Sequence, residues 1–206
     1  MRIGIIGSGH IGATVARRLV EAGHEVAISN SRGPDTLHDL ATAIGAKPAT
    51  VADAAEFGDL VVEAIPFGAY DSLPKDALKG KVVVDAANYY PGRDGTYDEV
   101  ENDTASAELI ARHLDKAKVV KAFNTMNWKN IRDLHKPAGD PGRLAMPVAA
   151  DDEDAKRTVF ELVDELGFDP VDGGTLHESK RQEPGTPVYG ADLKADAARD
   201  ALASAA

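Results

Sequence analysis

Three glycines near the amino terminus have the spacing of a phosphate-binding turn. Gly7, Gly9 and Gly12 stand in the pattern GxGxxG directly after an apolar run at residues 3–6. Glycine at the first position permits a tight turn, at the second lets the backbone approach a pyrophosphate, and at the third allows close packing of helix on strand. A helix starting here would aim free N–H groups at the phosphates. The pattern predicts a dinucleotide site at Gly7, Ser8, Gly9, His10, Ile11 and Gly12.

The residues after a second apolar run, 26–28, distinguish between the two nicotinamide cofactors. Sites that prefer NAD usually carry Asp or Glu here, about twenty residues beyond the glycines, to bind the ribose hydroxyls. This chain has no carboxylate between Ser29 and Gly33. Hydroxyl, amide and guanidinium groups can hold a 2′-phosphate instead, and Arg32 can also stack on adenine. The sequence predicts NADP(H) rather than NAD(H), bound through Ser29, Asn30, Ser31 and Arg32.

The spacing of apolar residues indicates strands that alternate with helices. Such alternation gives a mostly parallel sheet with both faces covered, an α/β fold of the Rossmann-type doubly wound class. Further strands are expected at residues 46–49, 60–64, 81–85 and 118–123, and helices at 37–44, 51–57, 70–78 (in part) and 103–114.

A Pro/Gly-rich break at residues 136–142 divides the chain. We expect an NADP-binding domain at residues 1–142 and a small α/β extension at residues 143–206 that packs on the same sheet. The extension should comprise a strand (144–149), a helix (152–166), a strand (168–172), a polar tail (173–190) and a terminal helix (191–206).

Three of the predicted strands end in loops that should meet at one edge of the sheet. Ligands of open α/β sheets gather at the carboxyl ends of the strands. The backbone of Ala64, Ile65 and Pro66 is expected beneath the ribose and nicotinamide. The loop at 86–95 and the segment at 124–128 reach the same edge. From them we assign Ala87 and Asn88 to the cofactor and Tyr89 and Met126 to the substrate, with Tyr90 and Trp128 nearby.

Composition excludes several classes of protein. A formal net charge of -11 argues against nucleic acid or an anionic membrane as partner. Absence of cysteine excludes disulfides, thiolate catalysis and Cys-ligated metal, and the six histidines lack HxH or HExxH spacing, so no metal site is predicted. The chain enters a strand at once, leaving no room for a signal peptide, and its apolar runs are too short to span a membrane. We expect a cytoplasmic protein.

No obvious acid–base group accompanies the predicted cofactor site. No Tyr is followed by Lys four positions on, so the Tyr/Lys relay of short-chain dehydrogenases is absent. Lys121 could act as a general acid if it were desolvated, but we interpret it as an ammonium that reaches solvent at a strand edge. His177, Lys180 and Arg181 lie in the tail, which either covers the site or is solvated. Hydride exchange between two redox rings would need no such group, because the cofactors supply the chemistry.

Six segments in order resemble the NADPH:coenzyme F420 oxidoreductase family, and the reductase domain of the STEAP metalloreductases is similar too. They are residues 7–12, 29–32, 65–67, 85–88, 121–125 and 172–176. The resemblance implies a Rossmann domain with a small extension, a homodimer, and hydride transfer between NADP(H) and F420, or FMN or FAD. By the same likeness Asn124, Thr125, Gly174 and Leu176 would lie beside the second ring.

Two other functions are compatible with the sequence. One is an NADPH-dependent reductase of a small carbonyl or imine substrate, with His177 or Lys180 as the acid. The other is a protein that binds NADPH as a redox sensor without turnover. In every case the partner is a small molecule or a second protein, not nucleic acid or membrane.

Overall fold

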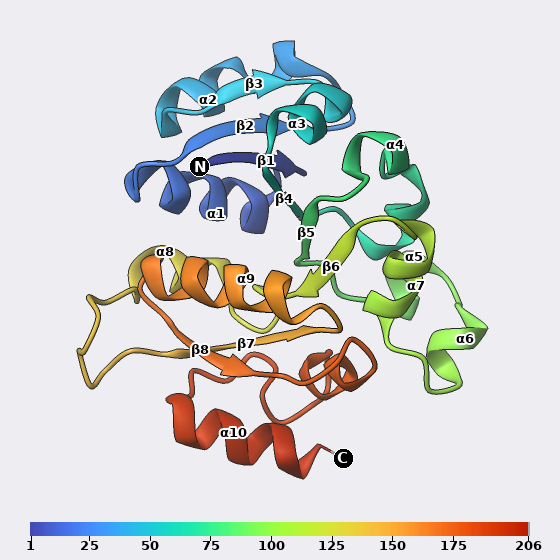
Figure 1. Ribbon diagram of the computed structural model, residues 1–206, viewed down its shortest axis with the longest axis vertical. Helices are drawn as coiled ribbons and strands as arrows, with labels where there is room; N and C mark the ends of the chain where they lie inside the picture. Colours follow the sequence, from blue (N-terminus) through green and yellow to red (C-terminus); the bar gives the residue numbers. More distant parts are fainter. Residues whose placement is uncertain (206) are drawn as a thin grey trace.

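The structure, a computed structural model, describes residues 1–205 and is built around a sheet of eight strands (Figure 1). The strand order is β3-β2-β1-β4-β5-β6-β7-β8. Neighbouring strands pair in parallel except β6 and β7, which are antiparallel. The strands are β1 (Arg2–Ile6), β2 (Glu25–Ser29), β3 (Lys47–Ala49), β4 (Leu60–Glu63), β5 (Val82–Asp85), β6 (Lys118–Lys121), β7 (Ala145–Ala150) and β8 (Asp169–Asp172).

Helices cover both faces of this sheet, because its central strands are apolar on both sides. One apolar core joins the sheet to α1 (His10–Glu21), α2 (His38–Ile44), α8 (Trp128–Asp133) and α9 (Glu153–Glu165). On the other face lie α3 (Val51–Phe57), α4 (Lys75–Leu78), α7 (Ser106–His113) and α10 (Ala195–Ser204). This confirms the predicted Rossmann-type doubly wound α/β fold.

Several local elements differ from the expectations drawn from the sequence. The expected helix at 70–78 is split around Pro74 into the 3₁₀ helix η2 (Phe67–Ser72) and α4, since proline breaks a helix interior. The helix expected from residue 103 begins at Ser106, because Asp103 has a φ of 86°. The terminal helix begins at Ala195 rather than at 191, and the last residue of that expectation, 206, lies outside the described residues.

Short helical turns occupy segments expected to be irregular. The loop that follows β5 contains α5 (Pro91–Asp94) and leads to α6 (Asp98–Glu101). The tail contains the 3₁₀ helix η3 (His177–Gln182), and η1 (Pro34–Leu37) precedes α2. Across residues 1–205, no helix has both the length and the apolar character that crossing a membrane requires.

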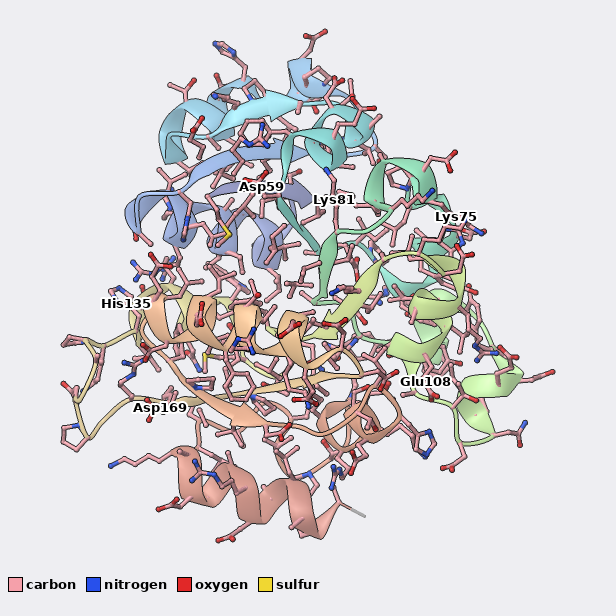
Figure 2. The ribbon with its side chains drawn as sticks, in the orientation of Figure 1. Asp59, Lys75, Lys81, Glu108, His135 and Asp169 are labelled. Atoms are coloured by element: carbon pink, nitrogen blue, oxygen red, sulfur yellow. The ribbon has the colours of Figure 1, made fainter. Side chains whose placement is uncertain are left out.

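Two charged side chains labelled in Figure 2 join elements that are distant in sequence. The Lys81 ammonium donates to the carbonyl groups of Ala55 (2.6 Å), Glu56 (2.9 Å) and Gly58 (2.7 Å), which closes the carboxyl end of α3. Glu108 on α7 accepts from the backbone N–H of Ala105 at 2.8 Å and contacts His177 on η3 at 3.2 Å. The second contact helps to hold the tail against α7.

Candidate functional site

The glycine turn between β1 and α1 satisfies two requirements, one of the fold and one of a ligand. Gly7 has a φ of 111°, and a Cβ there would lie 2.5 Å from the Ala64 carbonyl oxygen. A Cβ on Gly12 would overlap the carbonyl oxygen of Gly7. A Cβ on Gly9 would meet no atom within 4 Å. Gly7 and Gly12 therefore serve the fold, whereas Gly9 leaves open space in front of the helix, as a bound pyrophosphate requires.

One cavity of about 460 Å³, here the outer cavity, lies between the glycine turn and the end of β2. The Arg32 guanidinium borders this cavity and pairs with no carboxylate among residues 1–205. Asn30 orders the segment, since its Oδ1 accepts from the Arg32 N–H at 2.9 Å and its Nδ2 donates to Ser8 Oγ at 3.2 Å. The predicted residues that line it are Gly7, Ser8, Gly9, Asn30, Ser31, Arg32, Ala64, Ile65 and Pro66.

Ser29 is a correction to the predicted phosphate site. Its side chain is fully buried, and its Oγ donates to the Ile5 carbonyl oxygen at 2.9 Å. The Ser29 carbonyl oxygen in turn accepts from the Gly7 N–H at 2.9 Å. Ser29 thus joins β2 to β1 and to the glycine turn, and lies outside the cavity.

A second cavity of about 390 Å³, here the inner cavity, lies over the carboxyl ends of β4, β5 and β6. It shares Gly9, Ala64, Ile65 and Pro66 with the outer cavity. His10 stacks on Trp128 at its border, with ring centroids 4.6 Å apart and planes 8° from parallel. The other predicted residues that line it are Ile11, Ala87, Asn88, Asn124 and Met126.

Four residues predicted to bind substrate lie outside the inner cavity. Tyr89 is packed among Phe67, Tyr70 and Tyr97, and its hydroxyl contacts the Glu101 carboxylate at 2.8 Å. Thr125 is buried, and its carbonyl oxygen accepts from the Gly190 N–H at 2.8 Å. Gly174 and Leu176 begin the turn into η3, where Leu176 joins the core beneath α7. All four serve packing or the backbone path.

The inner cavity also contains residues that were not assigned to the site from the sequence, among them Arg93, Phe123 and Tyr189. Arg93 places its guanidinium carbon 4.9 Å from the centre of the Tyr90 ring. The Tyr90 hydroxyl meets the Tyr189 hydroxyl, which comes from the tail. Burial and this contact raise the pKa of Tyr189 to about 12. Phe123 follows β6 at the cavity wall. In the outer cavity the residues not assigned to the site from sequence are Ile6, Val51, Ala69, Ser72 and Leu73.

Three ionisable side chains are fully buried beneath the inner cavity, at paired positions of β4, β5 and β6. They are Glu63, Asp85 and Lys121. The Lys121 ammonium donates to Asp85 Oδ2 at 2.9 Å and to the Ala87 carbonyl oxygen at 2.6 Å. The expectation that Lys121 reaches solvent was wrong, because β6 is covered on both sides by β5 and β7.

The carboxyl group of Glu63 is fully buried next to the ion pair. Burial raises its pKa well above the usual value, and the neighbouring Asp85 charge adds to this, while the Lys121 ammonium opposes it. A raised pKa favours the neutral form of Glu63 beside the Asp85–Lys121 ion pair, and this form avoids the cost of an unpaired buried ion.

The polar residues of the tail that were candidate acids lie away from both cavities. His177 contacts Glu108, Lys180 pairs with Asp103, and Arg181 pairs with Glu178 at 2.7 Å. None of the three lines the inner or the outer cavity. The residue of the tail that lines the inner cavity is Tyr189.

The fold and the glycine turn define a Rossmann-type nucleotide-binding protein, and comparison with known proteins identifies its family. The family described as NADP oxidoreductase, coenzyme F420-dependent, matches residues 2–89. The chain is 30% identical to the F420-dependent NADP reductase of Methanothermobacter marburgensis over 208 residues, which cover 91% of this chain and 90% of that protein. The chain therefore belongs to the family of F420-dependent NADP oxidoreductases.

Other relatives extend this finding. A solved structure from Arthrobacter sp. FB24, with a proposed F420-dependent NADP reductase activity, has a TM-score of 0.76 and 32% identity, over 88% of this chain and 87% of that one. The rat metalloreductase STEAP3 is 29% identical over 185 residues, 88% of this chain. The chain spans 36% of the length of STEAP3 and matches 43% of Escherichia coli YjhV.

The glycine turn predicts opposite effects for two equivalent substitutions. Gly9→Ala should leave the melting temperature unchanged and weaken NADPH binding at least about tenfold, because its methyl group enters the space of the pyrophosphate. Gly12→Ala should instead lower stability by about 1–3 kcal/mol, because its methyl group forces α1 away from Gly7. Thermal unfolding and NADPH titration of both variants measure this. Wild-type affinity in Gly9→Ala would contradict the assignment.

The raised pKa of Glu63 predicts a pH-dependent difference between wild type and Glu63→Gln. The folded-state pKa is raised, so the stabilising contribution of Glu63 is complete below its unfolded pKa and is lost as the pH rises toward the folded pKa. Gln keeps the neutral shape at every pH. The melting temperature of Glu63→Gln minus that of wild type should therefore increase steadily between pH 5 and pH 8. A difference independent of pH would show that Glu63 is charged in the folded protein.

Proposed function

We propose that this protein transfers hydride between NADP(H) and the ring of a deazaflavin such as F420 or of a flavin. Its membership of the NADP oxidoreductase family supports the NADP(H) half, and its similarity to the F420-dependent NADP reductase of Methanothermobacter supports the F420 half. The observation that carries the proposal is the arrangement of the two cavities. They share one wall, Ala64–Ile65–Pro66, and only the inner one is lined by flat aromatic side chains.

The outer cavity has the features that the adenosine half of NADP(H) needs. Open space at Gly9 and the start of α1 suit the pyrophosphate, and the unpaired Arg32 guanidinium beside Ser31 suits a 2′-phosphate dianion. When bound, NADP(H) supplies or accepts the hydride at its nicotinamide ring. The role of this chain at that end is to hold the phosphates and to exclude cofactors that lack the 2′-phosphate.

The inner cavity has the features that a planar acceptor needs. The only Trp of the chain lines it, together with Tyr90, Phe123 and Tyr189. Such side chains offer large flat contact areas at low entropic cost. Asn88, Asn124 and Arg93 provide polar contacts at specific points, as is usual for small-molecule sites. These residues bind and orient the two rings, since orientation is what hydride transfer between rings requires of a protein.

Steady-state turnover with a panel of acceptors tests the proposal. Purified protein with NADPH should reduce at least one of F420, FMN and FAD, and ferric chelates should be tested beside them because of the STEAP resemblance. Small carbonyl and imine compounds serve as the opposing class. Turnover of these alone, or none with any acceptor despite tight NADPH binding, would contradict the proposal. We also propose that the protein is a homodimer, which a measurement of its mass in solution tests. We further propose that residues 143–206 form an extension, which limited proteolysis tests.

The cofactor preference depends on Arg32. Arg32→Asp should weaken NADPH binding at least about tenfold and leave NADH binding unchanged or improved, because the carboxylate repels a phosphate but accepts from ribose hydroxyls. Lys79→Asp, which makes the same change in charge at an exposed site outside both cavities, is the matched control and should have no effect on the ratio of the two dissociation constants. Equal weakening of both cofactors by Arg32→Asp would show that Arg32 acts only through the loop.

The hydride step itself needs no general acid, and the one proton that a reduced flavin or deazaflavin also takes up can come from water. We therefore expect mild effects at the titratable side chains of the inner cavity. His10→Gln, Tyr90→Phe and Tyr189→Phe should each lower kcat by about tenfold at most, whereas loss of a general acid typically costs about 10²–10⁴-fold. The measurement is kcat with NADPH and the acceptor that the panel identifies. A loss of more than a hundredfold at one of them, with NADPH affinity intact, would favour the carbonyl or imine reductase.

A further inference from the structure

Three side-chain amides meet at the base of the inner cavity. Asn124 Nδ2 donates to Asn88 Oδ1 at 3.1 Å and to the Gln182 carbonyl oxygen at 2.8 Å. Asn124 Oδ1 accepts from Gln182 Nε2 at 2.9 Å. Asn88 Nδ2 donates back to the Asn124 carbonyl oxygen at 2.9 Å. Asn88 and Asn124 line the cavity, whereas Gln182 is fully buried behind them on η3.

Asn124 uses both of its side-chain N–H donors within this cluster, whereas Asn88 does not. A primary amide has two N–H donors and a carbonyl oxygen with two lone pairs. Both donors of Asn124 are occupied by Asn88 and Gln182. Asn88 uses one donor and one lone pair on Asn124, which leaves one N–H and one lone pair on the same side-chain amide. The remaining lone pair can accept from an N–H of a ligand, and the remaining N–H can donate to a ligand carbonyl oxygen.

The backbone on either side of the Asn88 side chain is also held. The Ala87 N–H donates to Asp85 Oδ1 at 2.8 Å, and the Ala87 carbonyl oxygen accepts from the buried Lys121 ammonium. The carbonyl oxygen of Asn88 accepts from Arg93 Nη2 at 2.6 Å. Asn88 is therefore fixed through its backbone by β5 and α5 and through its side chain by Asn124.

The side-chain oxygen of Gln182 makes no hydrogen bond within residues 1–205. Its Oε1 has no hydrogen-bond partner among the described residues, although the side chain is fully buried. An unsatisfied buried acceptor is unfavourable, and an apolar side chain of the same length would avoid that cost. The favourable contribution of the Gln182 side chain is its bond to Asn124, with a weak contact of 3.4 Å to the Lys121 carbonyl oxygen.

We propose that Asn88 recognises an amide edge of the ligand in the inner cavity, and that Gln182 and Asn124 are positioning residues that fix the orientation of the Asn88 amide. The proposal rests on the proposed function for the identity of the two ligands that carry such an edge. One is the carboxamide of the nicotinamide ring, and the other is the imide (N3–H with its flanking carbonyls) of a flavin or deazaflavin ring. Both ligands carry an N–H donor, and the free lone pair of Asn88 Oδ1 would accept a hydrogen bond from it.

Two pairs of analogues separate these sources. NADP⁺ is compared with its 3-acetylpyridine analogue, in which a methyl group replaces the carboxamide NH₂. Lumiflavin is compared with N3-methyllumiflavin, which lacks the imide N–H. Dissociation constants are measured by titration for wild type, Asn88→Leu, Gln182→Met and Ser179→Ala. Ser179 lies on η3 and is equally buried, but its Oγ donates to the Leu176 carbonyl oxygen, so it is the matched control.

Wild type should bind the unmodified member of one pair about three- to tenfold more tightly than its analogue, as expected for one neutral hydrogen bond. In Asn88→Leu that ratio of affinities should fall below about twofold. If the preference came only from a steric clash of the added methyl group, the ratio would stay unchanged in this variant. The pair that loses its preference identifies the ligand. Gln182→Met should lose the same preference while it still unfolds cooperatively in thermal unfolding, and Ser179→Ala should keep it.

Three results would overturn the inference. They are a wild type that prefers neither unmodified ligand, a preference that survives in Asn88→Leu, and a Gln182→Met variant that keeps the full preference. These outcomes are independent of the proposed function, because equilibrium binding of NADP⁺ analogues is measurable in a protein without turnover. A protein that reduces no flavin or deazaflavin contradicts the proposed function alone.

Discussion

The ion pair between Lys121 and Asp85 determines the shape of the site. Burying two charges is costly, and such a pair is retained without net loss only where further hydrogen bonds satisfy its remaining atoms. Here the N–H and carbonyl groups of Ala87 provide those bonds. Removing either charge would leave the other unpaired inside the sheet, at a cost of about 3–5 kcal/mol. These bonds fix the backbone path directly after β5. That path in turn positions the residues that form the floor of the inner cavity.

Around this floor, each wall of the site comes from a different kind of element. The β1–α1 turn contributes backbone and open space, the segment after β4 contributes an apolar surface, and the segment after β6 contributes Asn124 and Trp128. The last wall is the tail, which returns from β8 and places Gln182 behind Asn124 and Tyr189 against Tyr90. The tail after β8 is thus part of the site.

The sequence was informative wherever a local rule of backbone geometry applies. The glycine spacing predicted the turn, the apolar runs predicted the parallel strands, and the lack of an acid after β2 selected Asn30, Ser31 and Arg32. It failed where the result depends on contacts between distant segments. Nothing near residue 189 indicates that Tyr189 meets Tyr90, and nothing in the β6 sequence shows that Lys121 faces Asp85 rather than solvent.

Errors at individual site residues have the same origin. Ser29 and Tyr89 stand next to residues that do line the cavities, but side chains alternate along an extended backbone, so neighbours in sequence face opposite ways. Ser29 turns into the sheet and Tyr89 into the aromatic core, whereas Asn30 and Asn88 face the cavities. Register between strands decides which member of each pair is available, and register is a property of the assembled sheet.

The segment Ala64–Ile65–Pro66 borders both cavities, and this has a thermodynamic consequence. Occupants of the two cavities would both contact these three residues, so neither could displace this backbone without altering the contacts of the other. By thermodynamic linkage, if the first occupant changes the affinity of the second by some factor, the second changes the affinity of the first by the same factor. Rigidity of these three residues thus sets the coupling free energy between the two halves of the site.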